Sequence, residues 1–231
     1  MRVVTYNTQG SLGMDGVRST ARIADALRPL SAEVVCFQEI YQRLPPVTTE
    51  DQPALLSSLL NRRFVFQRCL DFAFGGYGIG IAAQSGHLES YEHMLPAFKE
   101  QRGALEVRLR DIGGLHSVTI FCTHWGLHPD ERLLQAEKLA GAVKAAPRPI
   151  IVCGDLNEEA GGAAVQLLLE RTGLVDSDAA QNRATFVSEN PTVRIDYILH
   201  SEELRVTHCE VVSSMASDHL PFLADLEVAG D

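Results

Sequence analysis

The sequence predicts an α+β fold in which helices cover the outer faces of a large β core. Short β-branched segments bounded by turn residues recur along the whole chain, and the helical patterns are too few to alternate strictly with them. A hydrophobic content of 45% in 231 residues is enough to bury a substantial core. We therefore expect a single domain that spans residues 1–231.

Apolar runs predict the strands, which are expected at residues 2–8, 33–39, 63–69, 78–84, 104–110, 116–123, 148–153, 194–200, 206–212 and 221–228. Helical spacing of apolar residues predicts helices at about 16–29, 53–61, 129–145 and 160–171. The third helix has the clearest signal, because it opens with a proline followed by two acidic residues. Turn residues gather at 41–52 and 176–192, which we expect to be flexible loops.

Composition limits the kinds of partner and location. Thirty acidic against 20 basic residues give a net charge of -10, which disfavours tight, non-specific binding to duplex nucleic acid and leaves only a local basic patch for it. No segment approaches the roughly 20 apolar residues needed to cross a bilayer, and Met1-Arg2 leads directly into an apolar strand. We expect a cytoplasmic monomer without integral membrane association. The 5 cysteines, an odd number and mostly within apolar runs, are expected to be reduced and buried.

Polar side chains stand where predicted strands end or begin. A charge that abuts a buried strand is costly unless it is paired or bound to a metal, so several such residues together indicate a site. Their oxygen-rich chemistry suits Mg²⁺ or Mn²⁺, whereas zinc would require more histidine or cysteine. The members of this set are Asn7, Glu39, His124, Asp155, Asn157, Asp196, Asp218 and His219.

Most members of this set, taken singly, also have a simpler structural explanation. Glu39 could be an exposed residue at a strand end. Asp155 and Asn157 flank a leucine, a pattern that also fits an Asx turn or the cap of the following helix. Asp218 and His219 could form a polar turn before the last strand. Only the whole constellation favours a functional site.

Three residues, two of them outside this set, also have both a structural and a functional interpretation. His124 could be a hydrogen-bonded core histidine. Arg102 precedes a predicted strand, where its guanidinium could bind a substrate phosphate or could simply lie on the surface. Trp125 could stack on a base or a sugar, although a core position is the default for tryptophan. Asp196 is different, since a carboxylate within an apolar strand needs a partner, and a histidine is the obvious candidate.

The residues of this set stand in short motifs which, in their order along nearly the whole chain, resemble those of the endonuclease/exonuclease/phosphatase superfamily. The resemblance implies a four-layer α/β/β/α sandwich with two facing, mainly antiparallel sheets, and a metal-dependent hydrolase acting on phosphate esters. The matching motifs are Thr5-Tyr6-Asn7, Gln38-Glu39, Gly76-Tyr77-Gly78-Ile79-Gly80-Ile81, Thr123-His124, Gly154-Asp155-Leu156-Asn157, Arg194-Ile195-Asp196-Tyr197-Ile198 and Ser217-Asp218-His219.

The resemblance also implies a role for each polar residue near the metal. Glu39 resembles the principal Mg²⁺ ligand, and Asn7 and Asp218 are expected close to the ion. Asp155 and Asn157 resemble the groups that orient the nucleophilic water and hold the scissile phosphate.

The histidines complete the implied machinery. His219 resembles the family's general base or phosphate-binding histidine, and Asp196 its buried orienting partner. His124 would contact a phosphate oxygen or assist the leaving group. Gln9 departs from the aspartate that AP endonucleases carry there, which weakens that specific assignment. Whether His219 or Asp155 accepts the proton of the water stays open, as does the number of metal ions.

The substrate is a phosphate ester, and its class remains open. The hypothesis is a Mg²⁺-dependent phosphoesterase that cleaves a phosphodiester or phosphomonoester by in-line attack of an activated water. The alternative is a DNA-repair nuclease acting on nucleic-acid ends or lesions. A sphingomyelinase-like lipid phosphodiesterase and a non-catalytic binding module with the same fold are further alternatives. The low aromatic content of 6% and the acidic charge argue against bulk DNA.

Overall fold

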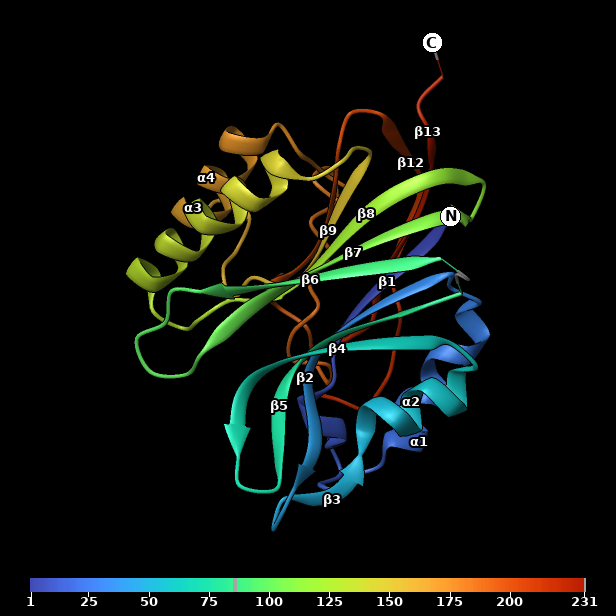
Figure 1. The fold of residues 1–231 in the computed structure, drawn as a ribbon, viewed down its shortest axis with the longest axis vertical. Coiled ribbons are helices and arrows are strands. Elements are labelled where there is room, and N and C mark those ends of the chain that lie inside the picture. Colours follow the sequence, from blue (N-terminus) through green and yellow to red (C-terminus); the bar gives the residue numbers. More distant parts are fainter. Residues whose placement is uncertain (85–86, 231) are drawn as a thin grey trace.

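Two β-sheets packed face to face form the centre of the protein, and a pair of helices covers each outer face (Figure 1). The computed structural model describes residues 1–84 and 87–230. The layers follow the order α/β/β/α, which confirms the four-layer sandwich. No helix within the described residues is long and apolar enough to cross a membrane.

The first sheet has seven strands in the order β12-β13-β1-β2-β5-β4, and β3 pairs with β2 at its side. All neighbours run antiparallel except β1 and β2, which are parallel. Its strands are β1 (Arg2–Asn7), β2 (Val34–Leu44), β3 (Thr48–Asp51), β4 (Arg63–Phe72), β5 (Gly75–Ala83), β12 (Leu204–Val211) and β13 (Phe222–Val228).

The second sheet has six strands in the order β10-β11-β9-β8-β7-β6. It repeats the plan of the first sheet, since its central pair, β8 and β9, is parallel and the other neighbours are antiparallel. Its strands are β6 (Leu88–Leu95), β7 (Arg102–Ile112), β8 (Leu115–His124), β9 (Ile150–Asp155), β10 (Val175–Asp176) and β11 (Asp196–His200).

Helices cover the sheets, and two of them connect the parallel strand pairs. Helices α1 (Thr20–Leu27) and α2 (Gln52–Leu60) pack on the first sheet, whereas α3 (Pro129–Ala145) and α4 (Ala163–Thr172) pack on the second. Two short 3₁₀ helices, η1 (Gln9–Ser11) and η2 (Arg28–Leu30), accompany the first layer. The apolar core is correspondingly divided into three parts, one between the sheets and one beneath each helical layer. All five cysteines are free thiols, and four of them are buried.

The structure corrects two predicted boundaries. Segment 41–52 is not a loop, because β2 continues to Leu44 and pairs with β3 in a hairpin. The turn residues at 41–52 mark only the tip of this hairpin. The helix expected at 16–29 begins at Thr20, where the side chain of Ser19 accepts a hydrogen bond from the backbone of Arg22.

Candidate active site

The carboxyl ends of β1, β8 and β9 and the middle of β2 meet at one cavity. Asn7 ends β1 next to Gln38 of β2, and His124 ends β8 next to Asp155 of β9. A cavity of about 550 Å³ opens at this point. Seven of the residues predicted from the sequence line it, namely Glu39, Arg102, His124, Asp155, Asn157, Asp218 and His219.

A buried carboxylate orients His219. Asp196 is completely inaccessible to solvent, and its Oδ2 lies 2.9 Å from His219 Nδ1 and accepts a hydrogen bond of 2.6 Å from Thr185 Oγ1. The ring of Phe186 packs against the imidazole with centroids 4.8 Å apart. Burial lowers the pKa of His219, but the charges of Asp196 and Asp155 outweigh this effect and raise the pKa to about 10. The histidine is therefore held in one orientation with Nε2 directed into the site.

Asp155 lies at the centre of the polar network. Its Oδ2 accepts a 2.9 Å hydrogen bond from Asn7 Nδ2 and lies 3.5 Å from His124 Nε2 and 3.6 Å from His219 Nε2. Its Oδ1 accepts a hydrogen bond from the backbone of Asn157. Burial raises the pKa of Asp155 to about 7; the charge of His219 lowers this pKa and that of Asp196 raises it. Asp155 is thus the carboxylate that both histidines face.

Asn157 combines a turn with a position in the site. Its backbone adopts a left-handed φ of 50°, and its side-chain amide donates to the carbonyl of Trp125 at 2.9 Å. The Asx turn considered from the sequence is therefore present, since the Asn157 N–H binds Asp155. The cap of α4 is formed differently, because the Glu158 carboxylate accepts from the backbone of Ala164.

Glu39 lies within a strand, and a bulge directs its side chain to the cavity. The pairing of β2 with β5 shifts register between Phe37 and Ile40, and Glu39 has a left-handed φ of 57°. Such a backbone conformation is costly for a residue other than glycine and is typical of functional positions. Asn7 Nδ2 donates to Glu39 Oε1 at 3.1 Å, while Asn7 Oδ1 accepts from the backbone of Gln9.

Glu39 shares the cavity with a second carboxylate, that of Asp218. Burial raises the pKa of Glu39, the hydrogen bond from Asn7 lowers it, and the charge of Asp218 raises it again. A cation between these two oxygen donors would offset both the burial and the repulsion. The donor set therefore fits a hard divalent ion.

His124 and Arg102 form the opposite wall. Arg102 NH1 lies 2.8 Å from His124 Nδ1, 3.3 Å from the Tyr77 hydroxyl and 3.0 Å from the Glu100 carboxylate. Burial, followed by the charges of Arg102 and His219, holds the pKa of His124 well below its usual value. A neutral His124 that accepts from Arg102 at Nδ1 carries its proton at Nε2 and can donate into the site.

Trp125 corrects one prediction. Its side chain has no exposed surface and packs in the core beneath α3 and α4, so it cannot stack on a substrate. The core alternative is confirmed for this residue.

Three residues of the site were missed from the sequence, namely Tyr77, Thr185 and Phe186. Thr185 and Phe186 lie in the segment 176–192, which was expected to be a flexible loop. Tyr77 stands in a glycine-rich motif that was noted for its resemblance and was not assigned to the site.

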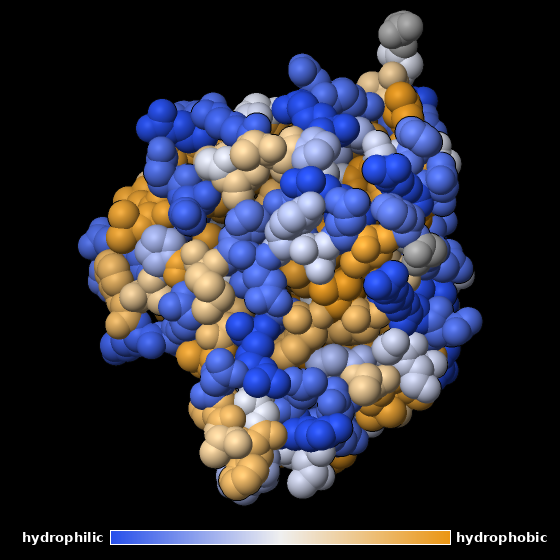
Figure 2. All heavy atoms as spheres, viewed as in Figure 1, coloured by the Kyte–Doolittle hydropathy of each residue, from blue (hydrophilic) through white to orange (hydrophobic). Residues whose placement is uncertain are grey.

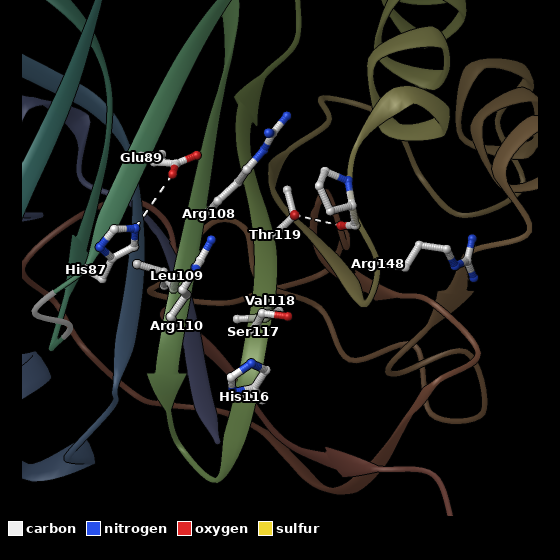
Figure 3. A pocket seen from close by; sticks show the side chains of 11 residues that line it. His87, Glu89, Arg108, Leu109, Arg110, His116, Ser117, Val118, Thr119 and Arg148 are labelled. Atoms are coloured by element: carbon white, nitrogen blue, oxygen red, sulfur yellow. Dashed lines mark hydrogen bonds and ion pairs between the residues drawn. The ribbon is translucent and has the colours of Figure 1, made fainter.

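A second hollow, of about 330 Å³, lies over β6, β7 and β8 (Figure 3). It is lined by basic side chains that include Arg108 and Arg148, but each of these donates to a carboxylate, that of Glu106 and that of Glu203 respectively. Arg110, which also lines it, is about 26 Å along β7 from Arg102 at roughly 3.3 Å per residue. This hollow is therefore remote from the polar network of the strand ends.

Comparison with known proteins agrees with this geometry. The sequence model of the Endonuclease/Exonuclease/phosphatase family matches residues 4–219. The chain belongs to the endonuclease/exonuclease/phosphatase family. Members of this family are hydrolases that act on phosphate esters, and they are typically dependent on a divalent metal ion. The predicted family membership is confirmed.

Similar proteins in this family include a bacterial relative without an assigned activity. The protein YbhP of Escherichia coli, described as uncharacterized, is 26% identical over 226 residues, which cover 89% of this chain and 87% of YbhP. A solved endonuclease/exonuclease/phosphatase structure from Beutenbergia cavernae superposes with a TM-score of 0.87 at 22% identity, covering 100% of this chain and 72% of that one. A mannosyl-6-phosphatase from Bacteroides thetaiotaomicron gives a TM-score of 0.77 at 18% identity, covering 98% and 99%. At these identities the solved structures share the fold.

Proposed function

We propose that the protein is a Mg²⁺-dependent phosphoesterase that hydrolyses a phosphodiester or phosphomonoester by in-line attack of a water molecule. The observation that carries this proposal is the convergence of Glu39, Asp155 and the Asp196-oriented His219 on one cavity. Phosphate-ester hydrolysis depends mainly on positioning and on charge stabilisation, and these residues supply both. The fold is compatible with small phosphate esters, as the similar mannosyl-6-phosphatase illustrates.

Glu39 and Asp218 would hold the cation. The side chains of Asp155, Asp196 and His219 also come within 4.8 Å of one another, which is close enough to hold an ion. Within that cluster, His219 Nδ1 and Thr185 Oγ1 are both already bound to Asp196 Oδ2, so we favour the Glu39 side of the cavity. A bound Mg²⁺, or Mn²⁺ in its place, would polarise a phosphoryl oxygen and offset charge on the leaving oxygen.

The remaining residues position the water and the phosphate. Asp155 Oδ2 and His219 Nε2, which are 3.6 Å apart, would face the attacking water together. Because the raised pKa of His219 keeps its imidazole protonated, Asp155 would accept the proton of the water, and the Nε2–H of His219 would donate to the water or to a phosphoryl oxygen. Asn157 and the Nε2–H of His124 would donate to phosphoryl oxygens. Arg102 lines the same cavity, and its guanidinium would bind a further phosphoryl oxygen.

The isosteric change Glu39→Gln tests the metal assignment. The variant keeps the size of the side chain but removes a charged donor, so we expect half-maximal hydrolysis of bis-p-nitrophenyl phosphate to require at least about tenfold more Mg²⁺. Glu89→Gln, which changes a carboxylate of the remote hollow in Figure 3, is the matched control and should behave as the unchanged protein. Turnover that persists in excess chelator would contradict the metal mechanism.

A further inference from the structure

An apolar pocket adjoins the catalytic cavity. This pocket, called here the Phe98 pocket, has a volume of about 400 Å³ and is formed by the β6–β7 connection and the start of α3. Three residues, Glu100, Arg102 and Leu127, line both this pocket and the catalytic cavity. The two spaces are therefore neighbours, and a group attached to a phosphate in one can extend into the other.

The pocket presents flat apolar surfaces to solvent. Phe98 is 54% exposed and Leu127 is 76% exposed, although both belong to large hydrophobic residue types. The Phe98 ring lies 5.4 Å from the imidazole of His128, and Pro129 adds a further apolar surface. Exposed apolar side chains that line a pocket beside a catalytic site indicate contact with a ligand.

Hydrogen bonds from buried side chains of α3 fix the two loops that form this pocket. Gln135 is completely buried on α3, and its Nε2 donates to the carbonyl of Pro96 at 2.8 Å while its Oε1 accepts from the backbone of Gly126 at 2.8 Å. Arg132 NH1 donates to the carbonyl of Leu127 at 2.7 Å. One glutamine thus ties both loops together, and the exposed Leu127 stands on a fixed backbone. A pre-formed pocket loses less entropy when a ligand binds.

The polar groups of the pocket narrow the class of ligand. The buried carboxylate of Glu131 and the side chain of Lys99 lie among the apolar surfaces. An acyl chain has no polar atoms to meet these groups, whereas an aromatic ring has flat faces for Phe98 and, if substituted, a polar edge. The side chain of Arg102 lines both spaces, so its guanidinium suits the phosphate that carries the ring.

We propose that the Phe98 pocket binds a planar aromatic ring on the alcohol part of the phosphate ester, attached directly as in an aryl phosphate or through a sugar as in a nucleoside phosphate. This assignment rests on the proposed function for the location of the phosphate itself. It adds a specificity site, because the ring contacts only the pocket and the phosphate contacts the catalytic cavity. Figure 2 shows further apolar surface at its lower edge, over the β2–β3 and β4–β5 hairpins. This surface lies outside the Phe98 pocket.

Non-hydrolysable phosphonates test the pocket without any need for turnover. Titration calorimetry in Mg²⁺ would compare methylphosphonate, cyclohexylphosphonate and phenylphosphonate, of which the last two have six-carbon rings and only the last is planar. We expect phenylphosphonate to bind about tenfold more tightly than either of the others, since stacking on an aromatic side chain is worth about that factor or more. The methylene phosphonate analogue of AMP distinguishes a nucleobase from a simple aryl group. If the pocket binds a nucleobase, this analogue should bind more tightly than phenylphosphonate; if it binds a simple aryl group, it should not.

Two pocket variants and one control complete the experiment. Phe98→Ala and Leu127→Ala should each remove most of the preference for phenylphosphonate, and Leu134→Ala, an exposed leucine of α3 outside the pocket, should leave it unchanged. Equal binding of phenyl- and methylphosphonate would overturn the pocket and leave the proposed function intact. Equal binding of phenyl- and cyclohexylphosphonate would overturn the aromatic assignment. Absence of binding by all of them would overturn both proposals.

Discussion

Replacing His219 by asparagine or by alanine separates the chemical role of this residue from its structural role. Asparagine can place its Nδ2 where the imidazole has Nδ1, so it keeps a donor for Asp196 but has no group at the position of Nε2. Alanine removes both. Because Nε2 is the atom that faces Asp155 at 3.6 Å, we expect both variants to lose hydrolysis by about 10²–10⁴-fold.

The two variants should differ in stability. Asp196 has no exposed surface, and without His219 its carboxylate keeps only the 2.6 Å hydrogen bond from Thr185. Removal of one partner of a buried ion pair costs about 3–5 kcal/mol of stability. Because Asp196 keeps one hydrogen bond, we expect His219→Ala to lower the free energy of unfolding by about 3 kcal/mol, at the lower end of this range. A restored hydrogen bond to a charged acceptor is worth about 1.5–3 kcal/mol, so His219→Asn should recover roughly 2 kcal/mol.

Equilibrium unfolding in urea and hydrolysis of bis-p-nitrophenyl phosphate measure the two effects. His116→Asn, which changes an exposed imidazole paired with Asp111 on the surface, is the control and should alter neither. Equal stability of the alanine and asparagine variants would refute the structural part of the reasoning. Near-normal turnover by His219→Asn would refute the assignment of Nε2 to the chemistry.

Two further changes test the framework of the site. Asp225→Asn breaks an ion pair of two hydrogen bonds between Asp225 on β13 and Arg2. This pair lowers the pKa of Asp225, so its contribution of about 0.5–1 kcal/mol to stability is present at pH 7 and is lost as the pH falls below 3.8. Urea unfolding at several pH values would measure this loss. A stability gap between this variant and the unchanged protein that does not narrow in acid would contradict that account. Gly154→Ala should destabilise the protein by about 2–4 kcal/mol, because the new Cβ would lie 2.1 Å from the carbonyl oxygen of Thr123. Gly141→Ala, which adds a Cβ in open space on α3, should stabilise the protein by about 0.5–1 kcal/mol. Thermal unfolding distinguishes these two glycine variants, and equal effects would contradict the close approach at Gly154.

Local sequence signals predicted the elements that depend on local interactions. Helix α3 has the predicted bounds because its proline, its acidic first turn and its apolar spacing all act within the helix. The edge strand β6 was missed, since most of its side chains are exposed and only its pairing with β7 defines it. The β2–β3 hairpin was taken for a loop for the same reason, because it depends on pairing with a neighbouring strand.

The sequence by itself determined which chemical groups the protein possesses and which strands carry them. Asn7, Glu39, Asp155 and His219 could be recognised because polar residues beside buried strands require an explanation. Their resemblance to a known family then assigned an order and a set of roles.

Only the tertiary structure decided how these groups act on one another. The Asp196–His219 hydrogen bond joins β11 to the segment before β13. Asp155 meets His124 because β9 pairs with β8, and it meets His219 because the two sheets pack face to face. The raised pKa of Asp155 and the burial of Trp125 are products of that packing. So is the Phe98 pocket, whose two loops are joined by Gln135. Hydrophobic pattern and turn chemistry are encoded locally, whereas distances between side chains on different strands arise only when the strands assemble.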